Sequence, residues 1–153
     1  MPGMRRIMIA GALATLIATP LLAAAQDAVD TRVAGLRQLG AAFKNVNDEL
    51  KSNTPQTMIL QISARQIRDA ARYQYGWFPA GSGPQARVNT KAKAAIWTQP
   101  AQFKAAQDAF AAQAAAFMRV TATGNAAAMR VQAKQLGEAC AACHRIYRVD
   151  DKH

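Results

Sequence analysis

Apolar residues recur at steps of three and four along most of the chain, which is the spacing of one face of an α-helix. Four such segments follow Ala25, separated by polar or Gly- and Pro-containing stretches. They cover residues 27–52, 54–76, 100–122 and 126–148. No segment shows the strict alternation of a half-buried strand. The pattern therefore predicts an all-α fold, an antiparallel four-helix bundle.

Each expected helix has its own set of inward-facing positions. In the first helix these are Val29, Val33, Leu36, Gly40, Phe43, Asn47 and Leu50. In the second they are Ile59, Ile62, Ile67 and Ala70, and in the third Phe103, Ala106, Phe110, Ala114 and Phe117. In the fourth they are Met129, Ala133, Leu136, Cys140, Cys143 and Tyr147. The aromatic residues on the first and third helices are most simply core residues, and a wall for a bound cofactor would need the same side chains.

Local signals mark where the helices begin and end. Thr54 followed by Pro55 predicts the start of the second helix, because proline suits the first helical turn. Gly124 followed by Asn125 predicts a stop and then a new N-cap. The connection over residues 77–98 is longer than most links between helices, so we expect it to be ordered against another part of the protein.

The N-terminal stretch over 1–25 has the features of a secretory signal peptide. Two arginines precede a mostly apolar run over residues 7–22, and three alanines then predict cleavage after Ala25. A membrane anchor is the alternative, but the run is short for a span and Pro20 interrupts it. The expected organisation is a cleaved signal peptide over 1–25 and a bundle over 26–153, located in the periplasm.

The chain from Gln26 onward keeps 17 Lys and Arg against 9 Asp and Glu, a formal charge of +8. Such a charge is compatible with nucleic acid, an anionic membrane or an acidic protein partner. Export argues against nucleic acid. The basic residues are scattered along the sequence, so they form either an ordinary solvated surface or a docking surface for an acidic redox protein.

The strongest chemical signal is Cys140-Ala141-Ala142-Cys143-His144. Two cysteines three residues apart lie on the same side of a helix, one turn apart. Each thiol can add to one haem vinyl group, and the following histidine then becomes an iron ligand. The motif predicts one covalent haem c, held by Cys140 and Cys143, with His144 as the axial ligand.

Three other interpretations of the two cysteines remain open. A redox-active disulfide motif normally starts a helix in an α/β fold, and no strand is expected here. A zinc site would have only two cysteines and two histidines available in the whole chain. A structural disulfide would be permitted in an oxidising compartment.

Residues 29–148 resemble the cytochrome c′ family, the class II cytochromes c. The resemblance rests on a haem motif in the last helix of a bundle, on residues 32–36, on 78–83 and on 96–97. It implies that Arg32 pairs with a haem propionate and that the residue four positions later faces the iron. An ordinary surface position is the alternative for Arg32.

The residue facing the iron is Leu36 in this alignment. Relatives of the c-556 type have a methionine there and carry electrons, whereas leucine has no lone pair to donate. The resemblance therefore implies a five-coordinate, high-spin iron that binds nitric oxide or carbon monoxide at an apolar distal site. The alternative function is that of a periplasmic electron carrier. A peroxidase is not supported, because no distal acid–base pair is evident near Leu36.

The resemblance has two further implications. Nitric oxide can displace the proximal histidine in this family and bind beside the arginine four residues later, here Arg148. A cation stabilising the helix C-terminus is the alternative role for Arg148. Family members form homodimers through the first two helices, and we expect Leu39 and Val46, which lie off the first helical stripe, to be exposed and to contribute.

Overall fold

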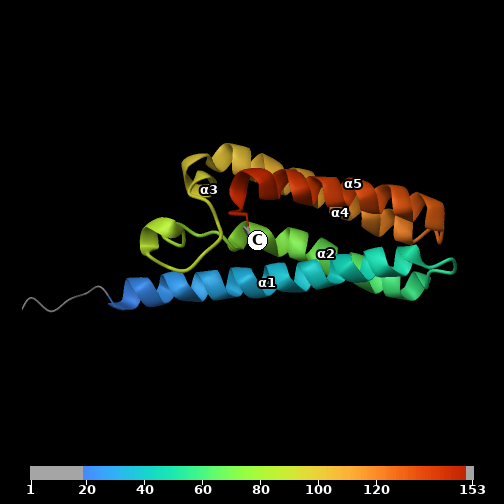
Figure 1. Cartoon of the computed structure of the whole chain (residues 1–153), viewed down its shortest axis with the longest axis horizontal. Coiled ribbons are helices and arrows are strands. Elements are labelled where there is room, and N and C mark those ends of the chain that lie inside the picture. Colours follow the sequence, from blue (N-terminus) through green and yellow to red (C-terminus); the bar gives the residue numbers. More distant parts are fainter. Residues whose placement is uncertain (1–18, 151–153) are drawn as a thin grey trace, which may run out of the picture.

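The structure is a computed structural model that describes residues 19–150, without the side chains of Thr19 and Pro20. Four long helices form it: α1 (Thr19–Lys51), α2 (Thr57–Tyr73), α4 (Pro100–Thr121) and α5 (Ala126–Tyr147). Figure 1 shows them lying along one common direction, with the short helix α3 (Ala95–Thr98) at one end. The prediction of an all-α four-helix bundle is confirmed.

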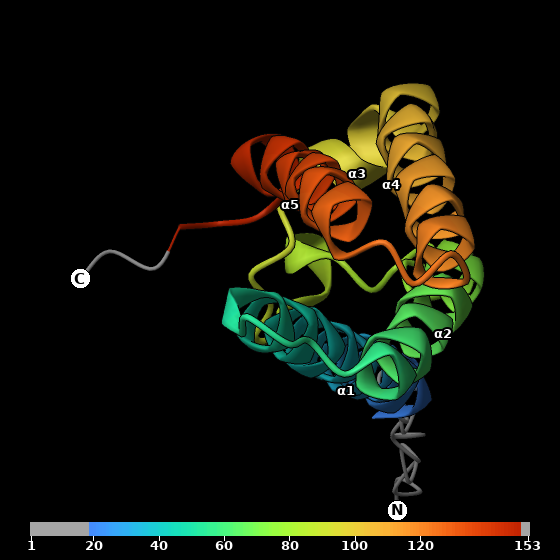
Figure 2. The same ribbon diagram turned by 90° about the vertical axis from the view of Figure 1, so that its right-hand side faces the viewer.

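The helices are arranged as two hairpins. α1 packs on α2, α2 packs on α4 and α4 packs on α5, whereas α1 and α5 meet at few points. The end-on view in Figure 2 shows the same order around the bundle. The edge between α1 and α5 is therefore the least tightly closed side of the bundle.

Most of the core comes from α2, α4 and α5, as their periodicity predicts. Phe110, Ala114 and Phe117 of α4 pack with Met129, Ala133 and Leu136 of α5. Burying large side chains of this kind stabilises the fold by about 1.5–3 kcal/mol each. In α2, however, Ile62 is exposed, and the buried face is instead formed by Leu60, Ser63, Ala64, Ile67, Ala70 and Ala71.

The core face of α1 differs from the predicted stripe. Its buried residues are Ala25, Val29, Arg32, Ala42, Val46 and Leu50. Gly40 and Asn47 are exposed, although both were expected to point inward. The expectation that Leu39 and Val46 would be exposed dimer residues is wrong, because Val46 is fully buried and Leu39 packs partly buried against the same core.

Helix ends follow the expected signals only in part. The Asn125 side chain accepts a hydrogen bond from the amide of Ala128, so the predicted N-cap of α5 is confirmed. Helix α2 begins later than predicted, and the amide of Gln56 before it donates to Glu49 Oε1 at 2.6 Å. Helix α1 begins at Thr19, before the predicted Asp27, and runs without a break past Ala25.

The expected signal peptide lies mostly outside the described residues, since 1–18 are not described. Its cleavage position after Ala25 stays a prediction. Among residues 19–150, no helix is both long and apolar enough to cross a membrane.

The long connection between α2 and α4 is ordered, as expected. It contains two short 3₁₀ turns, η1 (Gln74–Gly76) and η2 (Pro84–Ala86), and then α3. The indole of Trp77 covers Gly35 of α1 so closely that a β-carbon there would lie 2.3 Å from Cζ2. Glycine therefore lets this connection rest directly on the backbone of α1.

Candidate functional site

The three chemical residues of the motif lie on the last two turns of α5. Cys140 is half-buried against the main core, while Cys143 packs against a second, smaller cluster of Ala92, Ile96, Phe103 and Tyr147. Both thiols are free. His144 is exposed. The two sulfurs and the imidazole are thus available on one helical segment, in the order that haem attachment needs.

Burial determines the ionisation of these groups. It raises the pKa of the Cys140 thiol to about 11, and repulsion from Cys143 adds to the effect. It also raises the pKa of the Cys143 thiol. Partial burial lowers the pKa of the His144 imidazole, and the positive charge of Arg148 lowers it further. At neutral pH the imidazole is therefore mainly uncharged, which is the form that ligates a metal.

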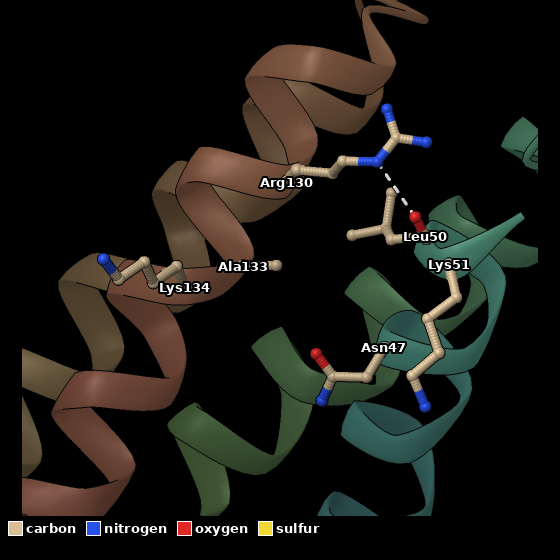
Figure 3. A pocket seen from close by; sticks show the side chains of 6 residues that line it. All are labelled: Asn47, Leu50, Lys51, Arg130, Ala133 and Lys134. Atoms are coloured by element: carbon tan, nitrogen blue, oxygen red, sulfur yellow. Dashed lines mark hydrogen bonds between the residues drawn. The ribbon is translucent and has the colours of Figure 1, made fainter. Parts of the chain in front are cut away.

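Contacts across the α1–α5 edge fix how these helices face each other. A β-carbon on Gly137 would lie 3.2 Å from Cζ of Phe43, so this ring covers Gly137. Near the C-terminus of α1 and the N-terminus of α5, Arg130 Nε donates to the carbonyl oxygen of Leu50 at 2.9 Å (Figure 3). A hollow of about 550 Å³ lies beside that bond, lined by Asn47, Leu50, Lys51, Arg130, Ala133 and Lys134.

These contacts define an antiparallel register between the two helices. Phe43 of α1 lies against Gly137 of α5, and the side chain of Arg130 reaches the carbonyl oxygen of Leu50, so α5 descends alongside α1 in the opposite direction. Every residue of an α-helix advances by about 1.5 Å, so equal steps along both helices stay level. Counting seven residues back from Phe43 and seven on from Gly137, we expect Leu36 near the level of His144.

Leu36 is one of the exposed large apolar side chains, with 40% of its surface accessible. It follows Arg32 by one helical turn on α1. An apolar side chain in such a position lacks burial within the protein itself, and a flat apolar group inserted between α1 and α5 would cover it.

Arg32 is buried to 2% exposure and connects α1 to the long connection. Its Nη1 donates to the oxygen of Trp77 at 3.3 Å and to Ser82 Oγ at 3.1 Å. Its Nη2 donates to the oxygen of Ser82 at 3.1 Å and to Thr90 Oγ1 at 2.8 Å. Burial lowers the pKa of this guanidinium. All four acceptors are neutral, so within residues 19–150 this buried cation has no carboxylate partner.

Aromatic rings surround the same arginine. Its Cζ lies 5.0 Å from the centroid of Phe78 and 5.8 Å from that of Trp97, in cation–π geometry. Phe78 packs edge-on against Phe103, which packs edge-on against Tyr147 of α5, with centroids 4.9 Å apart in each pair. The aromatic chain therefore links Arg32 to the helix that carries the cysteines.

A short backbone pairing closes this end of the bundle. Ala92 and Arg148 form an antiparallel bridge, in which the Lys93 amide donates to the oxygen of Tyr147 and the Val149 amide to that of Lys91, both at 2.8 Å. The Arg148 amide also donates to the oxygen of His144 at 3.0 Å, which ends α5. The segment after His144 is therefore held in place from two sides.

Comparison with known proteins agrees with this arrangement. The family model described as Cytochrome C′ matches residues 27–148. The chain belongs to the cytochrome c′ family. A cytochrome c′ of Rhodospirillum rubrum is 31% identical over 149 residues, which is 96% of this chain and all of that protein. A cytochrome c′ of Rubrivivax gelatinosus is 38% identical over 68 residues, covering 44% of this chain and 53% of that protein.

Solved structures show the same fold. The crystal structure of cytochrome c′ from Thermochromatium tepidum has a TM-score of 0.75 at 22% identity, over 82% of this chain and 97% of that one. A nitric oxide complex of an engineered cytochrome c′ from Alcaligenes xylosoxidans has a TM-score of 0.74 at 21% identity, with the same coverage. Proteins of the cytochrome c′ family bind a covalently attached haem c, and Cys140 and Cys143 are the two cysteines of this chain.

The family match favours haem attachment over the other interpretations of the two cysteines. No disulfide joins Cys140 to Cys143. Within the described part of the chain, no group of three or more His, Cys, Asp or Glu residues is placed to hold a metal ion.

Sequence reasoning missed the residues that organise Arg32. Ser82 and Thr90 lie in the connection and had no assigned role, although small hydroxyl residues in such a segment are frequent partners of backbone and side-chain donors. Gly35 was also overlooked, while a glycine inside a helical pattern can indicate close approach of another segment.

Proposed function

We propose that this cytochrome c′ family protein is exported to the periplasm, where its haem iron is five-coordinate and binds nitric oxide or carbon monoxide. The observation that carries the proposal is the packing of Phe43 on Gly137, from which we infer that Leu36 lies near the level of His144. A haem held by α5 and ligated by His144 would then present its opposite face to α1. Leucine offers no lone pair, so the sixth position stays free for a gas.

The methionines support this proposal. Within the described residues they lie on α2, α4 and α5, and α1 has none. Met129 is fully buried in the core, and Met118 packs against the same cluster. Met58 is 72% exposed at the start of α2. None of the three thioethers lies on the helix opposite His144, as ligation in the manner of the electron-carrier relatives would need.

The residues present fit a covalent haem c. Two free thiols one turn apart and an adjacent neutral imidazole are the donors that such a haem requires. Arg32 adds a buried positive charge that has no carboxylate partner among the described residues. A buried charge of this kind favours an anionic neighbour. We therefore assign Arg32 to a haem propionate, in addition to its hydrogen bonds to the connection.

The chemistry of the distal side favours gases that need no hydrogen bond. When bound, the haem supplies an iron that takes a diatomic ligand. Dioxygen bound to iron carries partial negative charge and is stabilised by a hydrogen-bond donor, which Leu36 lacks. Nitric oxide and carbon monoxide have no such requirement. The side chain of Leu36 would occupy space close to the iron, so a gas would have to displace it.

Arg148 is the proposed cation of the proximal side. Its charge is close enough to lower the pKa of His144, and its amide bonds to the His144 oxygen. A nitric oxide molecule that replaced His144 on the iron would find this guanidinium beside it. A solved structure of a ferrous variant of cytochrome c′ from Alcaligenes xylosoxidans has nitric oxide bound, so a related protein takes this ligand.

The ultraviolet–visible and EPR spectra of the purified ferric protein test the coordination state. We expect a high-spin signal without a methionine–iron charge-transfer band, and formation of a carbon monoxide adduct after reduction. A low-spin spectrum with that band would contradict the proposal and would favour the alternative, a periplasmic electron carrier of the c-556 type.

We also propose that the protein is a homodimer through α1 and α2. A cytochrome c′ with a TM-score of 0.75 to this chain is described as having a ligand-controlled dimer dissociation. The outer face of α2 carries Met58 and Ile62, one turn apart and 72% and 44% exposed. Sedimentation equilibrium should give twice the monomer mass at micromolar concentration, and a monomer there would rule the dimer out.

A further inference from the structure

Hydrogen bonds hold the edge between α1 and α5 at both of its ends. At one end, Arg130 of α5 donates to the carbonyl oxygens of Leu50 and Ser52, at 2.9 and 3.0 Å. At the other end, Arg32 holds α1 to the connection, and the backbone bridge holds the connection to α5. In Figure 2 this connection lies behind α1 and α5, at the far end of the edge. The two helices are therefore fixed relative to each other on either side of the haem motif.

Between these two ends, an aromatic ring of α1 lies against a glycine of α5. The side chain of Phe43 is half-buried, and its Cζ and Cε1 lie 3.2 and 3.6 Å from the position of a β-carbon on Gly137. The shorter distance is inside the range of about 3.5–4.0 Å that carbon atoms prefer. Since glycine contributes no side chain, the ring alone separates the two helices at this level.

The ring is close to the segment of α1 that we place over the iron. Leu36 precedes Phe43 by seven residues, which is about two turns and about 10 Å along the helix. Packed protein interiors have low compressibility, so a shift at one packed contact is passed on to its neighbours. Because Arg130 holds the far end of α1, a displacement of this helix at Phe43 continues toward Leu36.

We propose that the ring of Phe43 on Gly137 is a spacer, which sets the distance between α1 and α5 at the haem and thereby how firmly Leu36 covers the iron. The inference rests on the proposed function, in which Leu36 is the residue that a gas displaces. Phe43 and Gly137 are positioning residues in this proposal, because they act through Leu36. A wider spacing lets Leu36 give way more easily, so a gas enters faster.

A ring that obstructs the path of the gas is the alternative role for Phe43. The two roles respond differently to substitution. A smaller side chain at position 43 removes an obstruction, whereas a methyl group added to Gly137 pushes the helices apart and removes nothing. Substitutions on both sides of the contact therefore distinguish a spacer from an obstruction.

The test uses the haem-loaded protein, with carbon monoxide as the probe. Association rates are measured by flash photolysis for Gly137→Ala, Phe43→Leu and the variant that combines them. Gly40→Ala is the matched control on α1, because its new β-carbon would meet no atom within 4 Å. The midpoint of chemical denaturation is measured for the same variants, since it reports the contact without any gas.

We expect Gly137→Ala to speed carbon monoxide association at least about threefold. Adding Phe43→Leu to it should bring the rate back to within about twofold of the wild type, because the smaller side chain makes room for the methyl group. Phe43→Leu alone should not speed association, and a faster rate there would overturn the proposal in favour of an obstruction. Equal rates in Gly137→Ala and Gly40→Ala would overturn it as well.

The denaturation midpoints test the contact itself. Both glycine-to-alanine changes improve helix propensity, so a difference between them reports what the new methyl group meets. The midpoint of Gly137→Ala should lie below that of Gly40→Ala, and adding Phe43→Leu to each should reduce the difference. Equal midpoints of the two glycine variants would show that the ring yields freely and would overturn the spacer.

Spectra of the wild type separate this inference from the proposed function. A high-spin ferric spectrum and a carbon monoxide adduct, without any response of association to Gly137→Ala, would reject the spacer and leave the gas-binding function in place. A low-spin wild type with a methionine–iron band would reject the gas-binding function, and the role of the spacer in gas entry with it.

Discussion

The ring of Phe43 lies over Gly137, with Cζ 3.2 Å from the position that a β-carbon would occupy. Glycine at this point lets α1 and α5 approach along an edge where they otherwise meet little. The contact lies one helical turn before Cys140, so α1 and α5 pack against each other directly ahead of the haem motif. The proposed placement of Leu36 near the level of His144 rests on this contact.

Replacing Leu36 tests this register directly. Leu36→Ala should speed carbon monoxide association and raise affinity, because the gas no longer has to displace a branched side chain. A gain of about 1.4 kcal/mol would appear as a tenfold effect in flash-photolysis and equilibrium measurements. Val33→Ala, on the same helix, serves as the control. Unchanged kinetics in Leu36→Ala would mean that another residue covers the iron.

The opposite change at the same position should convert the coordination state. Leu36→Met places a thioether where the register faces the iron, so the spectrum should move toward a six-coordinate, low-spin form. Ferric absorption and EPR spectra measure this. A spectrum that stays fully high-spin would show that residue 36 does not reach the iron.

Covalent attachment should depend on both thiols. With cytochrome c maturation machinery, the wild type should keep its haem through acid–acetone extraction. Cys140→Ala or Cys143→Ala should each leave one vinyl group intact, which the pyridine haemochrome spectrum detects as a shifted band. Haem that extracts freely from the wild type would contradict the assignment.

Arg32 should stabilise the protein fold, in addition to its proposed pairing with a haem propionate. Arg32→Met removes four hydrogen bonds and leaves buried acceptors in the connection without donors, at a cost of about 1–3 kcal/mol for each unsatisfied group. We expect a loss of at least about 2 kcal/mol in the free energy of unfolding, measured by chemical denaturation. Arg37→Met, an exposed arginine on the same helix, should change it by less than about 0.5 kcal/mol.

The two glycines of α1 should respond in opposite directions. Gly35→Ala forces the Trp77 indole to move, because the new β-carbon would lie within 2.7 Å of three ring atoms, and should destabilise the protein by about 1–3 kcal/mol. Gly40→Ala meets no atom within 4 Å and should stabilise it by about 0.5–1 kcal/mol. Thermal unfolding of both variants measures the difference, and equal effects would contradict the packing described.

The sequence predicts α4 and α5 better than α1 for a physical reason. Phe103, Phe110 and Phe117 recur every seven residues on a helix that buries one face, so periodicity identifies that face. Helix α1 has apolar residues on more than one side: Val46 is buried in the core, whereas Leu36 is 40% exposed. A single periodic stripe cannot separate two such surfaces.

The residues of the chemical site also differ in how well the sequence predicts them. Cys140, Cys143 and His144 could be predicted because their chemistry depends on local spacing within one helix. The setting of Arg32 could not, because it depends on Ser82 and Thr90, which are distant in sequence. The family resemblance implies a propionate partner for Arg32, but nothing in the sequence indicates that its side chain is buried and bonded to the connection.

The bridge between Ala92 and Arg148 also affects how this end of the molecule opens. It attaches the last turn of α5 to a connection that Arg32 in turn attaches to α1, so no one of the three segments can separate without loosening the others. Such a unit unfolds locally in a single step. The amides of Lys93 and Val149 should therefore show the same free energy of opening in hydrogen exchange, and that free energy should fall by the same amount at both positions in Arg32→Met.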